Sequence, residues 1–157
     1  MIESSRIYID ANPFIYAIEG DKALARAMMD LFSLLRQRSG VGVTSELTLA
    51  EVLAKAKPPA RHRSYLSLVL WSKIFDLQPV TRDILIDTAK YRRANLVQHA
   101  DGSEIMPRLP DAIHIVTAIR SRCSTLLSAD RRLKLPRGMS LIEANLPGIS
   151  GLIERLS

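Results

Sequence analysis

Short apolar segments alternate with longer amphipathic segments along the chain, and this alternation limits the fold more than any other feature. Five short runs are typical of strands, at residues 6–9, 41–44, 74–80, 124–128 and 139–142. Parallel strands need crossover connections, and right-handed crossovers place helices on both faces of the sheet. We therefore expect a three-layer α/β/α sandwich with a central parallel sheet.

The segments between these runs predict the helices. Leu24, Met28, Leu31 and Leu35 recur at helical spacing over residues 21–38, and Gly40 is expected to end this helix. Other helix signals are Asn12-Pro13, Ser45 as a cap for a helix through Glu51 to about Ala56, a break at Pro58-Pro59, a helical pattern over 60–73, Thr81 as a cap, Pro110 as a start, and a short helical turn over 130–133. Residues 99–109 lack periodicity and are expected to form a surface loop.

Length and composition favour one folded domain over residues 1–157. Hydrophobic residues make up 47% and charged residues 24% of the 157 residues, close to the globular average. The start, MIESSRIYID, lacks the basic and apolar regions of a signal peptide, and the most apolar stretch, 65–71, is too short to cross a bilayer. Cys123 is the only cysteine, which fits a reducing compartment. We expect a cytoplasmic protein that does not enter a membrane.

The chain carries an excess of positive charge. Lys and Arg number 22 against 16 Asp and Glu, which gives a net charge of +6. Such a surface attracts polyanions such as RNA, although the same charge also serves solubility. Net charge alone leaves both interpretations open.

Four acidic residues are expected at one edge of the sheet. Asp10 directly follows the first strand, Asp130 lies two residues after the fourth, and Asp111 lies in the first turn of the helix that enters the fourth strand. Glu51 lies about two turns into the helix after the second strand. Ligands of open α/β sheets bind beyond the carboxyl ends of the strands, which is where these acids converge.

Each acid also has an ordinary explanation. Asp10 and Asp130 can start helices, and Asp111 can complement a helix dipole. The run Thr48-Leu-Ala-Glu51 matches a capping box. Together, however, clustered carboxylates repel one another and persist mainly where hard cations such as Mg²⁺ or Mn²⁺ neutralise them. Such a cation leaves coordination positions for a phosphate oxygen and a water molecule, which suits phosphodiester hydrolysis.

The motifs around these acids resemble those of PIN-domain ribonucleases, and among them the VapC toxins of toxin–antitoxin pairs. The resemblance covers nearly the whole chain and rests on four motifs: Ile-Tyr-Ile-Asp10-Ala-Asn12, Thr48-Leu-Ala-Glu51-Val-Leu, Leu109-Pro-Asp111-Ala-Ile-His-Ile-Val-Thr-Ala and Leu-Leu-Ser128-Ala-Asp130. It implies strand order 3-2-1-4-5, hydrolysis of single-stranded RNA, and Mg²⁺ or Mn²⁺ held by Asp10, Glu51 and Asp111. Asp130 would be a direct or water-mediated ligand. Ala129 departs from the family, which commonly has asparagine there.

Other polar residues near the acids are secondary candidates. Asn12 and Ser128 match polar positions of the family and are expected to orient ligands or water. His114, three residues after Asp111, either hydrogen-bonds a ligand carboxylate or phosphate or is a buried or rim histidine. Glu46 is the reserve candidate if Glu51 faces solvent. Arg131 and Arg132 follow Asp130 and are expected to meet RNA phosphates.

Three functions remain open from the sequence. The first is an RNA-cleaving toxin that inhibits translation and growth and is itself blocked by a cognate antitoxin protein. The second is a stand-alone PIN nuclease of RNA processing or decay. The third is a catalytically silent PIN-like module that binds RNA or protein. The apolar helices of residues 46–73 and the family resemblance also lead us to expect a homodimer.

Overall fold

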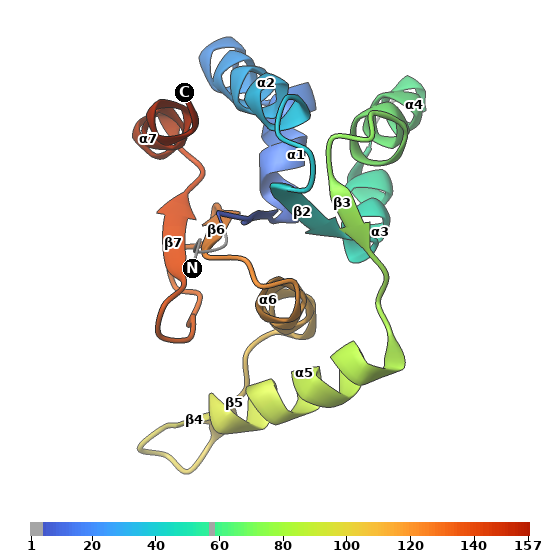
Figure 1. Cartoon of the computed structure of the whole chain (residues 1–157). Helices are drawn as coiled ribbons and strands as arrows, with labels where there is room; N and C mark the ends of the chain where they lie inside the picture. The colour runs from blue at the N-terminus through green and yellow to red at the C-terminus, as the bar shows by residue number, and fades with distance from the viewer. Residues whose placement is uncertain (1–4, 57–58) are drawn as a thin grey trace.

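A five-stranded parallel sheet forms the centre of the molecule (Figure 1). The computed structural model describes residues 5–56 and 59–157; the first four residues of the segment considered as a signal peptide, and Pro58 of the expected helix break, lie outside this description. The strands stand in the order β3-β2-β1-β6-β7, which is 3-2-1-4-5 when only strands of this sheet are counted. The predicted order is therefore confirmed. The strands are β1 (Ile7–Ile9), β2 (Gly42–Ser45), β3 (Asp76–Gln78), β6 (Thr125–Ser128) and β7 (Ser140–Glu143).

Helices cover both faces of this sheet. Figure 1 shows α1, α2, α4 and α7 on one side and α5 and α6 on the other, which confirms the three-layer sandwich. A π-helical turn, η1, extends α4 and completes the helical segment predicted over 60–73. The helices are α1 (Ala11–Glu19), α2 (Lys22–Arg36), α3 (Leu47–Lys55), α4 (Ala60–Leu66), η1 (Ser67–Trp71), α5 (Arg82–Ala94), α6 (Leu109–Arg120) and α7 (Leu146–Leu156).

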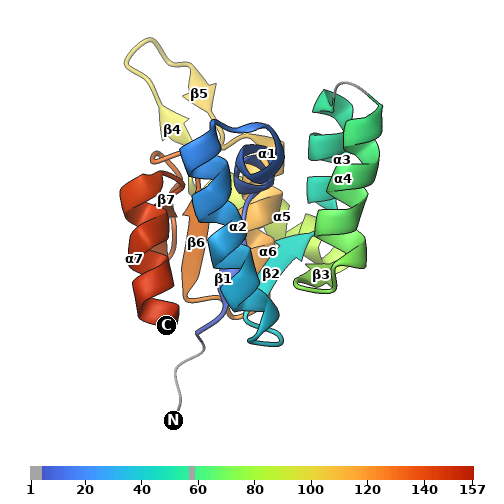
Figure 2. The same ribbon diagram turned by 90° about the horizontal axis from the view of Figure 1, so that it is seen from above.

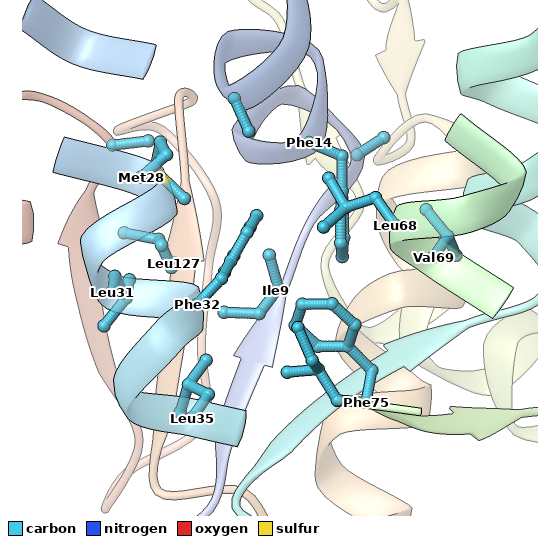
Figure 3. Close-up of a cluster of buried hydrophobic side chains, with 14 of the residues drawn as sticks. Ile9, Phe14, Met28, Leu31, Phe32, Leu35, Leu68, Val69, Phe75 and Leu127 are labelled. Atoms are coloured by element: carbon cyan, nitrogen blue, oxygen red, sulfur yellow. The ribbon is translucent and has the colours of Figure 1, made fainter. Parts of the chain in front are cut away.

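The central strand β1 is buried on both faces, so alternate residues join different cores. Ile7 and Ile9 pack with α1 and α2, whereas Tyr8 belongs to the core beneath α6. The larger core contains three phenylalanines, Phe14, Phe32 and Phe75, whose ring centroids lie 4.9 to 5.4 Å apart (Figure 3). These contacts fix α1 and α2 against the sheet, and with them the start of α1.

The segment predicted as a loop over residues 99–109 is in part a β-hairpin, so that prediction was incomplete. Strands β4 (Val97–Gln98) and β5 (Glu104–Ile105) pair antiparallel between α5 and α6. The turn follows from its sequence: Asp101 accepts hydrogen bonds from Ser103, and Gly102 adopts a positive φ of 88°. Figure 2 shows this hairpin projecting from the body of the fold.

Two helix ends differ from the prediction. Helix α2 ends at Arg36, and Gly40 lies in the turn after it, where it adopts a φ of +79° that glycine allows without steric cost. Residues 130–133 form no helix; they contain a turn in which the Asp130 carboxylate accepts the backbone N–H of Arg132. A local side-chain acceptor thus replaces the expected helical hydrogen bond.

Helix α7 was not predicted from the sequence. Pro147, Gly148 and Gly151 indicate turns rather than a helix, but Pro147 lies in the first turn, where it is tolerated. Asn145 caps the helix by accepting the N–H of Gly148. Burial of Ile149, among other apolar residues of α7, then stabilises the helix in the core it shares with α2.

Among the described residues, no helix combines the length and the apolar character needed to span a bilayer.

Candidate metal centre

The four predicted acids come from elements that meet at the carboxyl edge of the sheet. Asp10 follows β1 and Asp130 follows β6 by two residues. Helix α6 leads back to the start of β6, so its first turn, with Asp111, lies at the opposite, carboxyl edge. Helix α3 leaves the same edge after β2 and carries Glu51. The topology therefore gathers side chains that are distant in sequence.

Asp10 is buried, and each of its carboxylate oxygens accepts a hydrogen bond from the protein. Its side chain caps α1, because Oδ1 accepts the N–H of Ala11 at 2.8 Å. Oδ2 accepts the hydroxyl of Ser128 at 2.8 Å. The capping role that the sequence allowed is thus present together with the position in the acidic cluster. Each carboxylate oxygen keeps a second lone pair that can bind a cation.

His114 is the residue around which the cluster is organised. It is 2% exposed, and its Nε2 lies 2.5 Å from Oε1 of Glu51 and 3.4 Å from Oδ1 of Asp10. Asp10, Glu51 and His114 each offer one ligand atom, and these atoms lie within 4.8 Å of one another. The sequence offered two interpretations of His114, a carboxylate partner and a buried histidine, and both are correct.

The contact with Tyr8 favours one tautomer of the neutral His114 ring. Its hydroxyl lies 2.6 Å from Nδ1, and burial, followed by the negative charge of Asp10, raises the pKa of Tyr8 well above its usual value. The tyrosine therefore stays protonated and donates to Nδ1 of the neutral ring, whose own proton is then on Nε2 and faces Glu51. In the protonated ring Nε2 is again a donor. Either form holds Glu51 in place through the same N–H.

Burial and carboxylate neighbours act in opposite directions on His114. Burial by itself lowers the pKa of the imidazole, but the hydrogen bond to Glu51 and the charges of Asp10, Glu51 and Asp111 outweigh it, so the pKa is raised. Burial also raises the pKa of Asp111, and the charges of Asp10 and Asp130 add to this effect. The acids thus repel one another as expected for a site that binds a cation.

Asp130 lies at the more exposed side of the site. The backbone N–H of Arg132 and its guanidinium both donate to Oδ1, at 2.9 and 3.2 Å. These hydrogen bonds, led by that from the backbone, lower the pKa of Asp130 despite partial desolvation. Ser128 connects this acid to Asp10, because its hydroxyl donates to Asp10 and accepts the N–H of Asp130 at 3.1 Å.

The capping box considered as an ordinary explanation for Glu51 is not formed. Thr48 lies inside α3, fully buried, and its hydroxyl pairs with that of Thr44 at 2.9 Å. The N-cap of α3 is Glu46, the reserve candidate, which makes no capping hydrogen bond through its side chain and is not part of the metal-ligating group. Ser45 still accepts the N–H of Leu47. With the capping role removed, Glu51 is free to serve the cluster through His114.

Comparison with known proteins identifies the family of this fold. A family model described as "PIN domain" matches residues 7–138. The chain belongs to the PIN-domain family. This confirms the family that the four sequence motifs indicated. No curated protein shows significant similarity to the chain.

Solved structures share the fold of this PIN domain at low sequence identity. VapC20 of Mycobacterium tuberculosis, described as a toxin that cleaves the sarcin-ricin loop, has a TM-score of 0.55 and 14% identity over 76% of this chain and 86% of its own. VapBC2 of Rickettsia felis, bound to a DNA fragment from its promoter, has a TM-score of 0.60 and 16% identity over 87% of this chain and 97% of its own. At such identities the likeness shows a common fold.

The remaining candidates of the PIN domain lie in different surroundings. Asn12 is in the first turn of α1, half-buried, and its side chain forms no hydrogen bond with residues 5–56 or 59–157. Arg132 stays beside Asp130, whereas Arg131 is directed toward Glu143, with Nε 3.7 Å from Oε1. Arg132 is therefore the better placed of the two arginines for a ligand at the acids.

The donor set of this PIN domain fits a hard divalent cation. Carboxylate oxygens from Asp10 and Glu51 lie together, and burial, followed by repulsion from acidic neighbours, destabilises the Asp111 anion. A cation would relieve that repulsion. His114 also offers a ring nitrogen to such an ion, but while Nε2 donates to Glu51 it acts as a partner of the carboxylates. The roles of the site residues remain predictions.

Proposed function

We propose that the chain is a metal-dependent endoribonuclease that cleaves single-stranded RNA. The observation that carries this proposal is the group of Asp10, Glu51 and His114, buried except for the half-buried Glu51, at the carboxyl edge of a PIN-domain sheet. Asp10, Glu51 and Asp111 would hold Mg²⁺ or Mn²⁺ and its waters, and Asp130 would act directly or through water. When bound, such an ion polarises a phosphate oxygen and favours ionisation of a bound water.

The side chains of the protein prepare this site. Ser128 fixes one oxygen of Asp10, and the Ala11 amide fixes the other. The N–H of His114, itself held by Tyr8, fixes Glu51. These contacts hold two carboxylates in one geometry before any ligand arrives, so that little reorganisation is needed during the reaction.

We further propose that this nuclease is a toxin controlled by an antitoxin protein. The proposal is supported by the fold shared with VapC20, described as a toxin, and with the VapBC2 structure. An antitoxin would place an Arg or Lys against Asp10 and Asp111, where it replaces the charge of the metal ion. The surface outside the acidic site is more basic than the net charge of +6 suggests, and it would attract acidic segments of that partner.

The assembly and location of the protein are further parts of this proposal. We propose that residues 1–157 act as one domain, since α7, beyond the matched region, packs against α2. A homodimer through the helices of residues 46–73 agrees with the exposed Leu70 and Trp71 on η1. The expected cytoplasmic location stays a prediction.

The test replaces Asp10 by asparagine. Asp10→Asn removes the charge but keeps the volume and the capping oxygen, so we expect a folded protein that no longer cleaves single-stranded RNA in Mg²⁺. The matched control is Asp21→Asn, which alters the N-cap of α2 away from the site and is expected to cleave like the parent. Cleavage by Asp10→Asn at the parental rate would rule out the proposed centre.

A second experiment tests the toxin. The chain is co-expressed with the product of the neighbouring gene, the complex is purified, and RNA cleavage is measured before and after the partner is removed. We expect an inactive complex and an active stripped chain. An active complex, or no complex, would favour the stand-alone nuclease, and failure to bind Mn²⁺ would favour the silent module.

A further inference from the structure

A recess opens directly beside the acids, and the chemistry described above gives no role to the space inside it. It is a pocket of about 400 Å³ between the β4–β5 hairpin, α5, α6 and the turn after β6. Asp111 and Asp130 line its edge, so the pocket and the candidate metal centre share one wall. Its size is that of sites that enclose a small organic ligand.

The far wall of the pocket is apolar although it faces solvent. Ile105 and Met106 of the hairpin region are 56% and 37% exposed, and Val97 is 40% exposed. Tyr91 adds an aromatic ring, held in place because its hydroxyl donates to the carbonyl of Lys134 at 2.6 Å. Exposed apolar side chains that gather around one recess indicate a ligand with an apolar face.

The rim of the pocket is positively charged. Arg108, Arg132 and Lys134 line it, three cationic side chains against the two carboxylates of Asp111 and Asp130. The pocket therefore favours an anionic ligand and disfavours a basic peptide side chain. A nucleotide combines the apolar face of its base with anionic phosphate, and it therefore matches both features of this pocket.

Asn95 offers a polar contact at the same pocket. Its Nδ2 donates to the carbonyl of Tyr91 at 2.9 Å, while its Oδ1 accepts no hydrogen bond from the parts of the chain at 5–56 and 59–157. A side-chain amide with an available acceptor can recognise the hydrogen-bonding edge of a base. The pocket thus combines a stacking surface, a polar contact and cations for the backbone.

We propose that this pocket binds one unstacked base of the RNA, adjacent to the phosphate that is cleaved, and so contributes to sequence preference. The inference rests on the proposed nuclease function. The hairpin is the element that creates the apolar wall, and the shared acids place the neighbouring phosphate at the metal centre. Single-stranded RNA fits this arrangement because its bases are free to leave the stack.

The test changes the apolar wall and leaves the acids intact. Ile105→Thr combined with Met106→Thr removes two exposed apolar side chains and keeps a β-branched residue in β5. The matched control, Leu85→Thr combined with Ile86→Thr, removes an adjacent exposed pair from α5, 47% and 50% exposed. Both pairs are introduced into Asp10→Asn, and binding of a fluorescein-labelled single-stranded RNA of twelve nucleotides is measured by anisotropy in EDTA.

We expect the hairpin pair to weaken RNA binding at least about fivefold, the lower end of the range for loss of one stacked base, and the α5 pair to have no effect. The same RNA carrying 4-thiouridine should crosslink to the pocket, at Tyr91 or Met106. Removing the crosslinked base alone should weaken binding as much as the hairpin substitutions do.

The outcomes separate this inference from the proposed function. If the parent cleaves RNA but the hairpin pair binds it as tightly as the control pair does, the base pocket is wrong and the nuclease stands. If the hairpin substitutions abolish binding of the partner protein and leave RNA binding unchanged, the pocket is a protein site and the inference is wrong. A parent chain that neither cleaves nor binds RNA overturns both.

Discussion

The hydroxyl of Tyr8 is expected to stabilise the protein through a single buried hydrogen bond. Tyr8→Phe removes that hydroxyl and changes the packing little, since the ring stays in the core beneath α6. Nδ1 of His114, 2.6 Å from the hydroxyl in the parent, then has no donor, and the imidazole is only 2% exposed. Water has little access to replace the lost partner.

The size of the effect follows from this burial. A buried polar group left without a partner costs about 1–3 kcal/mol. For a chain of this length each kcal/mol shifts the melting temperature by roughly 2–4 °C, so the expected decrease is about 2–12 °C. Without the hydroxyl the imidazole is held by a hydrogen bond at Nε2 alone, so the orientations of the ring and of Glu51 are less fixed. Cleavage should therefore fall along with stability.

Thermal unfolding followed by circular dichroism measures the shift, and Tyr91→Phe is the control. The hydroxyl of Tyr91 likewise makes one hydrogen bond, to the carbonyl of Lys134, but this bond is exposed and water can replace the hydroxyl as donor. We expect a smaller loss there, within about 1 kcal/mol. If Tyr8→Phe melts at the parental temperature, or no lower than Tyr91→Phe, the argument that Tyr8 orders His114 is refuted.

Four further predictions concern the site and the assembly. Ser128→Ala removes the donor to Asp10 and should lower RNA cleavage about tenfold or more in initial-rate assays, with an unchanged rate contradicting the coupling. Added Mn²⁺ should raise the melting temperature of the parent more than that of Asp10→Asn; equal shifts would place the ion elsewhere. Burial raises the pKa of the Cys123 thiol from 9.0 to about 12. The free energy of unfolding should therefore fall as pH rises above about 9, and it should fall less steeply in Cys123→Ala. Parallel pH profiles of the two proteins would contradict this prediction. Trp71 is the only tryptophan of the sequence and is 58% exposed. Its fluorescence emission should shift to shorter wavelength as the proposed homodimer forms at micromolar concentration. A monomer found by light scattering at that concentration would refute the homodimer.

The sheet and the four acids were accessible to sequence analysis for a common reason. Residues such as Ile9 and Leu127 lie in strands buried on both faces, so the strands appear as short continuous apolar runs. Asp10 and Asp130 follow such runs closely, and the topology of parallel strands then determines the edge at which they meet. The pattern contains this information without any tertiary contact.

The contacts that organise the acids could not be predicted in the same way. The sequence places His114 near Asp111 on a helix, but its partners Tyr8 and Glu51 are 106 and 63 residues away. A signal was present, since His114 lies three residues after an acid on the same helical face. Only the packing of α6 on β1 and α3 turns that proximity into a hydrogen-bonded group.

The structures missed by the sequence analysis depend on local conflicts that packing resolves. The hairpin had a signal in Asp101-Gly102, but its strands of two residues are too short for a periodic pattern. Helix α7 contains Gly148 and Gly151, which disfavour a helix until its apolar face is buried. In both cases the tertiary environment decides between weak local preferences.

Asp10 has an implication for how this protein could change over generations. The same carboxylate that belongs to the acidic cluster also begins α1, and asparagine is as good a helix cap as aspartate. A single inherited exchange of Asp10 for asparagine would therefore remove the charge while the chain still folds and accumulates. Under the proposed function, one substitution would then give a folded but inactive protein, and selection would act on the lost activity rather than on a lost fold.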